Sequence, residues 1–263
     1  MMENVKRPQV QVRDVVFGGE SYLLCVPLVS RTREQLIADA QSIMASRPDL
    51  IEWRVDYYEG YPQPAPILEA LAALREIAGP TPIIFTSRHA EEDGLLDITA
   101  EDKFQLIDEV SGTGMIDLVD IELQYGATQI AKWRDLLHAR NTKLIVSTHN
   151  FKTGWKPKQI REMLLSEQQA GADIVKLVTR VKNVRELADL SDAIHEARQT
   201  FLHVPVIAGA VGSVSPLMRV MGDCLGSDMT FVSAGGKKSH ASQLHIDDLR
   251  RLRERLDAPP FPR

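Results

Sequence analysis

The chain has 263 residues, of which 44% are hydrophobic and 25% charged, a composition close to that of soluble globular proteins that excludes extensive disorder. Its formal net charge of -5 leaves no general basic field and argues against a nucleic-acid-binding protein. Two cysteines without a Cys-x-x-Cys pair cannot form a disulfide framework, and no apolar segment approaches the ~20 residues that span a bilayer.

Strand-like and helix-like segments alternate along the chain. Runs rich in β-branched residues lie at 22–29, 49–55, 82–87, 116–123, 143–148, 173–179, 204–210 and 228–233. Helical spacing is found at 31–46, 65–78, 99–111, 127–140, 157–170, 182–200, 214–222 and 242–257. Thr32 and Gln35 have the spacing of a capping box in the first helix, and Asn141 is a candidate stop for the fourth.

This alternation predicts an α/β fold with a parallel sheet and right-handed crossovers. Eight units of about 30 residues favour one closed (β/α)₈ TIM barrel over residues 1–263. The alternative is a doubly wound sheet, whose dinucleotide-binding form carries a Gly-x-Gly-x-x-Gly turn that is missing after the first run. Residues 9–20 alternate partly and contain Gly18-Gly19, which predicts an N-terminal β-hairpin closing one end of the barrel.

Charged residues gather at the ends of the predicted strands, where the active sites of such barrels lie. In the second run Glu52, Arg54 and Asp56 share one face, because strand side chains alternate. Asp120 and Glu122 do the same in the fourth run. Charges on the face of a buried strand need partners, so the pattern indicates either a functional site or a structural ion-pair network.

Two further residues are candidates for chemistry. His149 directly follows the fifth run, and the reference pKa of histidine, about 6.5, suits proton transfer near neutrality. Lys176 interrupts the otherwise apolar sixth run. A buried lysine either pairs with an acid, here Asp120 or Glu122, or exists largely as a neutral amine, the nucleophile of Schiff-base enzymes.

The segment after the last run is rich in glycine and contains Lys237 and Lys238. Such a segment is typical of a mobile lid or, alternatively, of a phosphate-binding loop, although the two lysines can equally be a solvated pair. The sequence has no His-Glu-x-x-His motif and no clustered cysteines and histidines with zinc spacing. We therefore expect no metal ion.

Several motifs agree in order and spacing with those of one enzyme family. They are Glu52-Trp53-Arg54-Val55-Asp56, Phe85-Thr86-Ser87-Arg88 with Glu92 four residues on, Asp120-Ile121-Glu122, Ser147-Thr148-His149-Asn150-Phe151 and Gly171-Ala172-Asp173-Ile174-Val175-Lys176. In these motifs the chain resembles the type I 3-dehydroquinate dehydratases from the first strand to the last helix.

The resemblance implies that Lys176 forms an imine with the substrate ketone, that His149 shuttles protons and that Glu92 orients the histidine. The residues that it implies for substrate binding are Glu52, Arg54 and Arg88 at the ring, Arg219 at the carboxylate, and Ser239 and Gln243 from the lid. Asp56 and Asp120 match acidic strand positions that support these groups.

The activity implied is dehydration of 3-dehydroquinate to 3-dehydroshikimate by a hydro-lyase of the shikimate or quinate pathway. The resemblance further implies no organic cofactor, a small carboxylated cyclic substrate, and a homodimer. We expect the protein in the cytoplasm, with no nucleic-acid or membrane partner. The alternatives are a class I aldolase, a dehydratase for another hydroxy-keto acid, and a non-catalytic metabolite-binding paralogue.

The sequence departs from the family pattern in two places. The family run Met-Gly-x-x-Gly-x-x-Ser-Arg reads Val211-Gly212-Ser213-Val214-Ser215-Pro216-Leu217-Met218-Arg219, and the family's Pro-Gly before the lid glutamine reads Ala241-Ser242. Gly209 and Val211 stand where methionines usually pack on the substrate ring. These changes affect substrate fit and loop closure rather than the lysine, histidine and glutamate.

Overall fold

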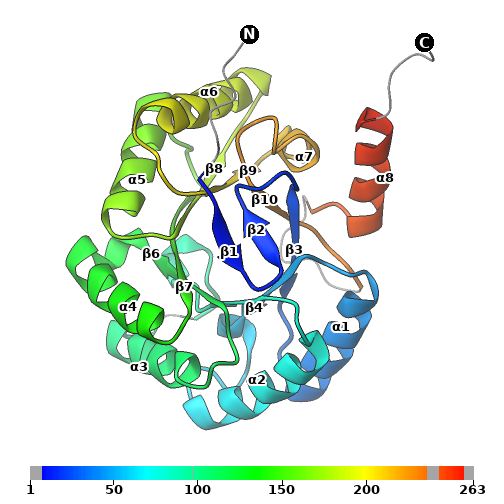
Figure 1. Ribbon diagram of the computed structural model, residues 1–263, viewed down its shortest axis with the longest axis vertical. Helices are drawn as coiled ribbons and strands as arrows, with labels where there is room; N and C mark the ends of the chain where they lie inside the picture. The colour runs from blue at the N-terminus through cyan, green and yellow to red at the C-terminus, as the bar shows by residue number, and fades with distance from the viewer. Residues whose placement is uncertain (1–7, 97, 236–242, 258–263) are drawn as a thin grey trace.

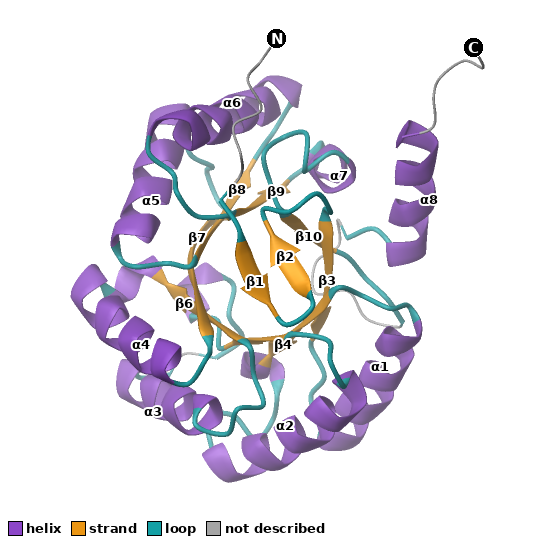
Figure 2. Cartoon of the chain, in the orientation of Figure 1, coloured by secondary structure: helices purple, strands orange, loops and turns teal. Residues whose placement is uncertain are grey.

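The computed structural model describes residues 8–96, 98–235 and 243–257. Its centre is a ring of eight parallel strands, surrounded by helices (Figures 1 and 2). The strands are β3 (Leu23–Leu28), β4 (Leu50–Arg54), β5 (Ile83–Thr86), β6 (Leu118–Glu122), β7 (Lys143–Asn150), β8 (Ile174–Arg180), β9 (Val206–Val211) and β10 (Met229–Phe231). The helices are α1 (Arg33–Ala45), α2 (Pro64–Ala78), α3 (Ala100–Ser111), α4 (Ala127–Ala139), α5 (Pro157–Gln169), α6 (Val184–Thr200), α7 (Ser215–Val220) and α8 (Ile246–Asp257).

The strand order confirms the TIM barrel and rules out the doubly wound sheet. Neighbouring strands follow each other in sequence from β3 to β9, and β10 pairs with β3. Asp228 closes the remaining gap, because its backbone N–H donates to the Val206 carbonyl and its carboxylate accepts from the Val206 N–H, both at 2.7 Å. The barrel is therefore nearly closed.

Local signals in the sequence explain several element ends. The Gln35 N–H donates to Thr32 Oγ1 at the start of α1. The Gln35 side chain accepts from the Arg31 N–H rather than from that of Thr32, so only half of the capping box forms. Asn141 follows α4 with a φ of 59°, the left-handed conformation of a helix stop.

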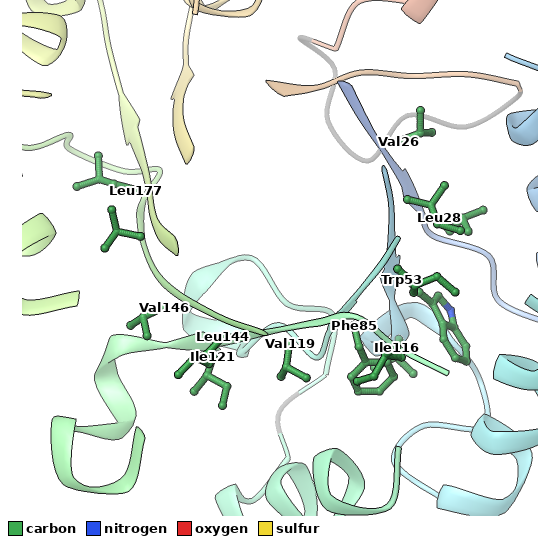
Figure 3. Packing of buried hydrophobic residues seen from close by; sticks show 14 of the residues in the cluster. Val26, Leu28, Trp53, Phe85, Ile116, Val119, Ile121, Leu144, Val146 and Leu177 are labelled. Atoms are coloured by element: carbon green, nitrogen blue, oxygen red, sulfur yellow. The ribbon is translucent and has the colours of Figure 1, made fainter. Parts of the chain in front are cut away.

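The strands place alternate side chains on two sides of the sheet. Those pointing outward form the main apolar core beneath the helices, where Trp53 and Phe85 pack edge to face with ring centres 5.9 Å apart (Figure 3). Leu144 and Val146 of β7 belong to the same layer. The side chains that point inward near the carboxyl ends of the strands are not part of this core and can form a site.

The predicted hairpin consists of β1 (Val10–Val12) and β2 (Val15–Phe17), which pair in antiparallel fashion. It lies across the ring of strands in Figure 1. Val12 and Phe17 are buried against a separate apolar cluster formed by the first inward residues of the strands, such as Leu50 and Leu118. The hairpin thus closes the amino-terminal end of the barrel, as expected, and leaves the carboxyl end for the polar residues.

Within the part of the chain that the structure describes, no helix has the length and apolar character needed to cross a membrane.

Candidate active site

The inward positions of the strands change from apolar to polar toward the carboxyl end of the barrel. In β4 the inward residues are Leu50, Glu52 and Arg54, and in β8 Ile174 is followed two residues later by Lys176. A pocket of about 630 Å³, including its open mouth, lies at this end.

Most of the residues predicted for the site meet in this pocket. Those that line it are Glu52, Arg54, Arg88, Glu92, His149, Lys176, Arg219 and Gln243. Asp56 and Asp120 are buried beside them. Ser239 lies outside the described residues, as do Lys237 and Lys238, so the phosphate-loop alternative has no described geometry.

Lys176 lies in the middle of β8 and is 4% exposed. Its Nζ donates to Asp120 Oδ2 at 2.7 Å and to Glu52 Oε1 at 3.4 Å, and it lies 4.7 Å from the centre of the Phe231 ring. Of the two acids considered as partners from the sequence, Asp120 is the one that pairs with the lysine. Glu122 forms ion pairs with Arg88 and Lys103 instead.

Asp120 is shared between two cations. Arg88 donates to Asp120 Oδ2 at 2.8 Å, and Ser147 donates to Asp120 Oδ1 at 2.6 Å. Burial alone would raise the pKa of this carboxyl, but Arg88 and Lys176 hold it well below its usual value. Asp120 is therefore an anion that fixes the ammonium group of Lys176 inside the barrel.

Arg54 and Asp56 differ from their predicted arrangement. The strand ends at Arg54, and Asp56 lies in the 3₁₀ turn η1 (Val55–Tyr57), so the expected common strand face holds for Glu52 and Arg54 only. The Arg54 guanidinium donates two 2.8 Å bonds to Asp56. The same carboxylate accepts from the backbone N–H of Leu95 at 3.2 Å, so donors from two segments hold Asp56 in this turn.

Glu92 and His149 form a hydrogen-bonded pair, with 2.7 Å between Glu92 Oε2 and His149 Nδ1. Glu92 is placed by the 3₁₀ turn η2 (Ala90–Glu92), and the Phe151 ring stacks on the imidazole at 5.5 Å. Burial, together with Arg88 and Lys176, lowers the pKa of His149 well below its usual value. The imidazole is thus neutral at neutral pH and has the protonation state of a base.

Burial raises the pKa of Glu92 to about 8, an effect that Arg88 opposes and that Glu122 and Asp120 reinforce.

We expect Glu92→Gln to remove a pH dependence of the free energy of unfolding. Below pH 4.5 the carboxyl is protonated in both the folded and the unfolded chain. Between 4.5 and about 8 only the unfolded chain ionises, so the native protein should lose roughly 3 to 5 kcal/mol relative to Glu92→Gln as the pH rises.

Urea unfolding of both proteins at pH 5 to 9 measures this difference. Glu91→Gln is the matched control, because Glu91 is adjacent and exposed and should follow the native curve. Parallel pH dependences for the native protein and Glu92→Gln would contradict the raised pKa of Glu92.

Arg219 and Gln243 line the pocket from segments beyond the strands. Arg219 lies on α7 and donates to the Phe231 carbonyl at 2.8 Å, and burial lowers its pKa to about 10. It remains a cation at neutral pH. Gln243 is 3% exposed and lies shortly before α8, which starts at Ile246.

Lys103 was not predicted from the sequence, and on the apolar wall of the pocket Gly209 was predicted but Val178 was not. Lys103 reaches the barrel from α3 and forms an ion pair with Glu122. Its signal was a lysine at helical spacing from the buried Ile107 and Val110. On the wall, Gly209 faces Val178, and a Cβ at Gly209 would lie 3.1 Å from Val178 Cγ2.

Among residues 8–96, 98–235 and 243–257, no group of histidine, cysteine and acidic side chains has an arrangement that could hold a metal ion. The acids of the barrel interior instead contact arginines and lysines. The pocket combines an amine with a histidine and glutamate pair, which is the set needed for nucleophilic attack and proton transfer on a carbonyl compound.

Fold and site together define a TIM-barrel enzyme with a lysine-centred pocket at the carboxyl ends of its strands. A sequence model of type I 3-dehydroquinase matches residues 24–258. The 3-dehydroquinate dehydratase of Geobacillus sp. strain WCH70 is 32% identical over 250 residues, which are 95% of each chain. That of Listeria monocytogenes serovar 1/2a is 32% identical over 248 residues, 94% of this chain and 98% of the relative.

A solved structure of the same enzyme is also similar to this chain. The crystal structure of 3-dehydroquinate dehydratase from Geobacillus kaustophilus has a TM-score of 0.93 and 30% identity, with 98% of this chain and 100% of that chain covered. The chain belongs to the type I 3-dehydroquinase family. The enzyme class expected from the motifs, a hydro-lyase, is thereby confirmed.

Proposed function

We propose that the protein dehydrates 3-dehydroquinate to 3-dehydroshikimate through an imine on Lys176. The observation that carries the proposal is the buried amine of Lys176 in one pocket with the hydrogen-bonded pair of Glu92 and His149. Relatives that match nearly the whole chain are 3-dehydroquinate dehydratases. A type I enzyme from Clostridium difficile, with a TM-score of 0.90 and 28% identity over 95% of this chain and 98% of that chain, was solved with covalent modified comenic acid.

The proposed reaction begins with attack of the Lys176 amine on the substrate ketone. Loss of water from the adduct gives an iminium ion, whose positive charge is that of the ammonium form in which Lys176 starts. The positive nitrogen makes the neighbouring C–H acidic. His149, neutral for the reason given above, accepts that proton, and the electron pair forms an enamine. The enamine expels the β-hydroxyl group, which takes the proton from His149 and leaves as water.

Hydrolysis of the product iminium returns the amine and consumes the water released in its formation. The net change is therefore loss of one water molecule from the substrate. Asp120 can hold the ammonium form of Lys176 between turnovers, since it accepts from Nζ in the ligand-free pocket. In its ionised form Glu92 accepts from the Nδ1–H of His149, which leaves the other ring nitrogen without a proton and able to take one from the substrate.

We further propose how the pocket holds the substrate. Arg219 supplies the positive charge for the substrate carboxylate, and Gln243, which also lines the pocket, adds an amide. Glu52, Arg54 and Arg88 line the pocket and are assigned to the ring and its hydroxyl groups. Ser239, which lies outside the described residues, is assigned to the lid by resemblance alone.

The same resemblance supports one domain, a homodimer, and a cytoplasmic enzyme of the shikimate or quinate pathway. For the dimer, the exposed Leu217 and Met221 on or beside α7 and Leu252 and Leu256 on α8 offer apolar surface. Sedimentation at micromolar concentration tests this assignment, because a monomer under those conditions contradicts it.

The direct test of the activity is the absorbance of the conjugated enone formed from 3-dehydroquinate. We expect metal-independent turnover in the presence of a chelator. A panel of phosphorylated and carboxylated hydroxy-keto compounds separates the alternatives. Turnover of another compound with none of 3-dehydroquinate, or binding of 3-dehydroquinate without turnover, would overturn the proposal.

A further inference from the structure

Lys103 is a buried cation that takes no part in the reaction proposed above. It lies in the first turn of α3 and is 1% exposed. Its ammonium group forms an ion pair with Glu122 Oε2 and lies 4.7 Å from the centre of the Tyr125 ring. A cation near a helix amino terminus opposes the helix dipole, and an unpaired buried ammonium is strongly unfavourable. The role of this lysine is therefore to be found at Glu122 rather than in α3.

Glu122 connects Lys103 with two parts of the pocket. Its Oε1 accepts from Arg88 at 2.9 Å and from the His89 backbone N–H at 3.0 Å. The second bond fixes the start of the segment that carries Glu92. Burial alone would raise the pKa of Glu122, but Lys103 and then Arg88 lower it below its usual value. Lys103 thus keeps this carboxylate ionised inside the barrel.

Arg88 carries the effect on to the reactive amine. Its NH1 donates to Glu122 and its NH2 to Asp120 at 2.8 Å, and Asp120 accepts from Lys176. The buried charges form one alternating row from α3 to the centre of the pocket: Lys103, Glu122, Arg88, Asp120 and Lys176. Removal of a charge at one end of such a row changes how strongly the charged groups at the other end attract each other, because the protein interior screens charges poorly.

We infer that Lys103 is a positioning residue that neutralises Glu122, so that Arg88 stays shared with Asp120 and Asp120 does not hold the amine of Lys176 too firmly. Without Lys103 the Arg88 guanidinium would be drawn to Glu122, and Asp120, with less of Arg88, would hold the Nζ of Lys176 more tightly. The inference rests on the proposed function only in taking Lys176 as the nucleophile.

The first test is a double-mutant cycle between Lys103 and Glu122. Lys103→Met should lower kcat by about 10- to 100-fold, as displacement of a reacting group does, with a smaller rise in KM because Arg88 also lines the pocket. Lys103→Met combined with Glu122→Gln should recover kcat to within about threefold of the native protein, because both charges are gone and glutamine keeps an acceptor for Arg88 and His89. Lys158→Met is the control, since Lys158 is 81% exposed and pairs with Glu162 on the surface.

The pH profile of kcat provides a readout, at Glu92, that a loss of folding stability alone would not move. Lys103 is one of the charges that lower the pKa of Glu92, which faces Arg88, Asp120, Glu122 and His149 as well. In Lys103→Met the pH profile of kcat should shift to higher pH, because the pKa of Glu92 rises when Lys103 is lost. In the double variant it should return toward the native profile, because the opposing charge of Glu122 is lost as well. An unshifted profile in Lys103→Met would contradict the inference.

A second readout needs no substrate. Reductive methylation with formaldehyde and cyanoborohydride, followed at Lys176 by peptide mass spectrometry, measures how readily this amine reacts. We expect it to be at least about threefold slower in Lys103→Met and restored in the double variant. An unchanged rate in Lys103→Met, or a folded double variant that remains slow, overturns the inference.

These readouts separate the two proposals. Absence of dehydratase activity in the native protein would overturn the proposed function, while the methylation rates would still decide the role of Lys103. If Lys103→Met does not fold, the charge-balanced double variant is expected to fold and to react at the native rate, and slow methylation there contradicts the inference.

Discussion

Replacement of Lys176 by alanine is expected to lower kcat for 3-dehydroquinate by on the order of 10⁴-fold or more, because no other group described in the pocket offers an amine at that place. The variant should still fold, since Asp120 keeps its bonds from Arg88 and Ser147. Loss of the ammonium nevertheless leaves the acids of the barrel with less positive charge, so some loss of thermal stability is expected.

Lys182→Ala is the matched control. Lys182 follows the same strand, β8, but is exposed outside the pocket, and its removal should leave kcat at the native value. A steady-state enone assay with both variants, accompanied by thermal unfolding, makes the comparison. Substantial activity in folded Lys176→Ala would contradict the assigned role of the amine.

The second large effect is expected at His149. His149→Ala should lower kcat by about 10²- to 10⁴-fold, the range associated with removal of a general acid or base. Imine formation requires the amine of Lys176 rather than the imidazole as its nucleophile, so the variant should still form a covalent adduct. The adduct should accumulate, because the later proton transfers become slow.

Rapid mixing with 3-dehydroquinate and borohydride measures both parts of this prediction. His138→Ala is a suitable control, since His138 pairs with Asp173 on the outer side of the barrel and is well exposed. A native rate in His149→Ala, or complete loss of the adduct together with turnover, is inconsistent with a proton-shuttling histidine.

The architecture and the inward residues of the strands were largely predictable because both follow from short-range patterns, whereas Glu92 and Gln243 were assigned to the pocket by the family resemblance. The period of two in β4 places Glu52 and Arg54 inward, and the same period in β8 points Lys176 into the barrel. Parallel strands bring their carboxyl ends to one edge, so residues distant in sequence were expected to meet. Motif order then distinguished one family among the many that use this barrel.

The pairing of charges was not predictable from the same patterns. Asp56 accepts from the backbone N–H groups of Arg88 and Leu95, which lie on a separate segment. Asp120 pairs with the amine of Lys176, while Glu122 pairs with Lys103, which comes from a helix rather than a strand. These are contacts between elements, and strand periodicity carries no information about them.

The central claim is that Lys176 carries the substrate during the reaction. Treatment with borohydride during turnover of 3-dehydroquinate, followed by peptide mass spectrometry, tests it most directly. The account predicts that the reduced ligand is added to the peptide at Lys176 and that turnover stops in proportion. Full turnover with Lys176 unmodified, or an adduct confined to another lysine such as Lys103, would contradict it.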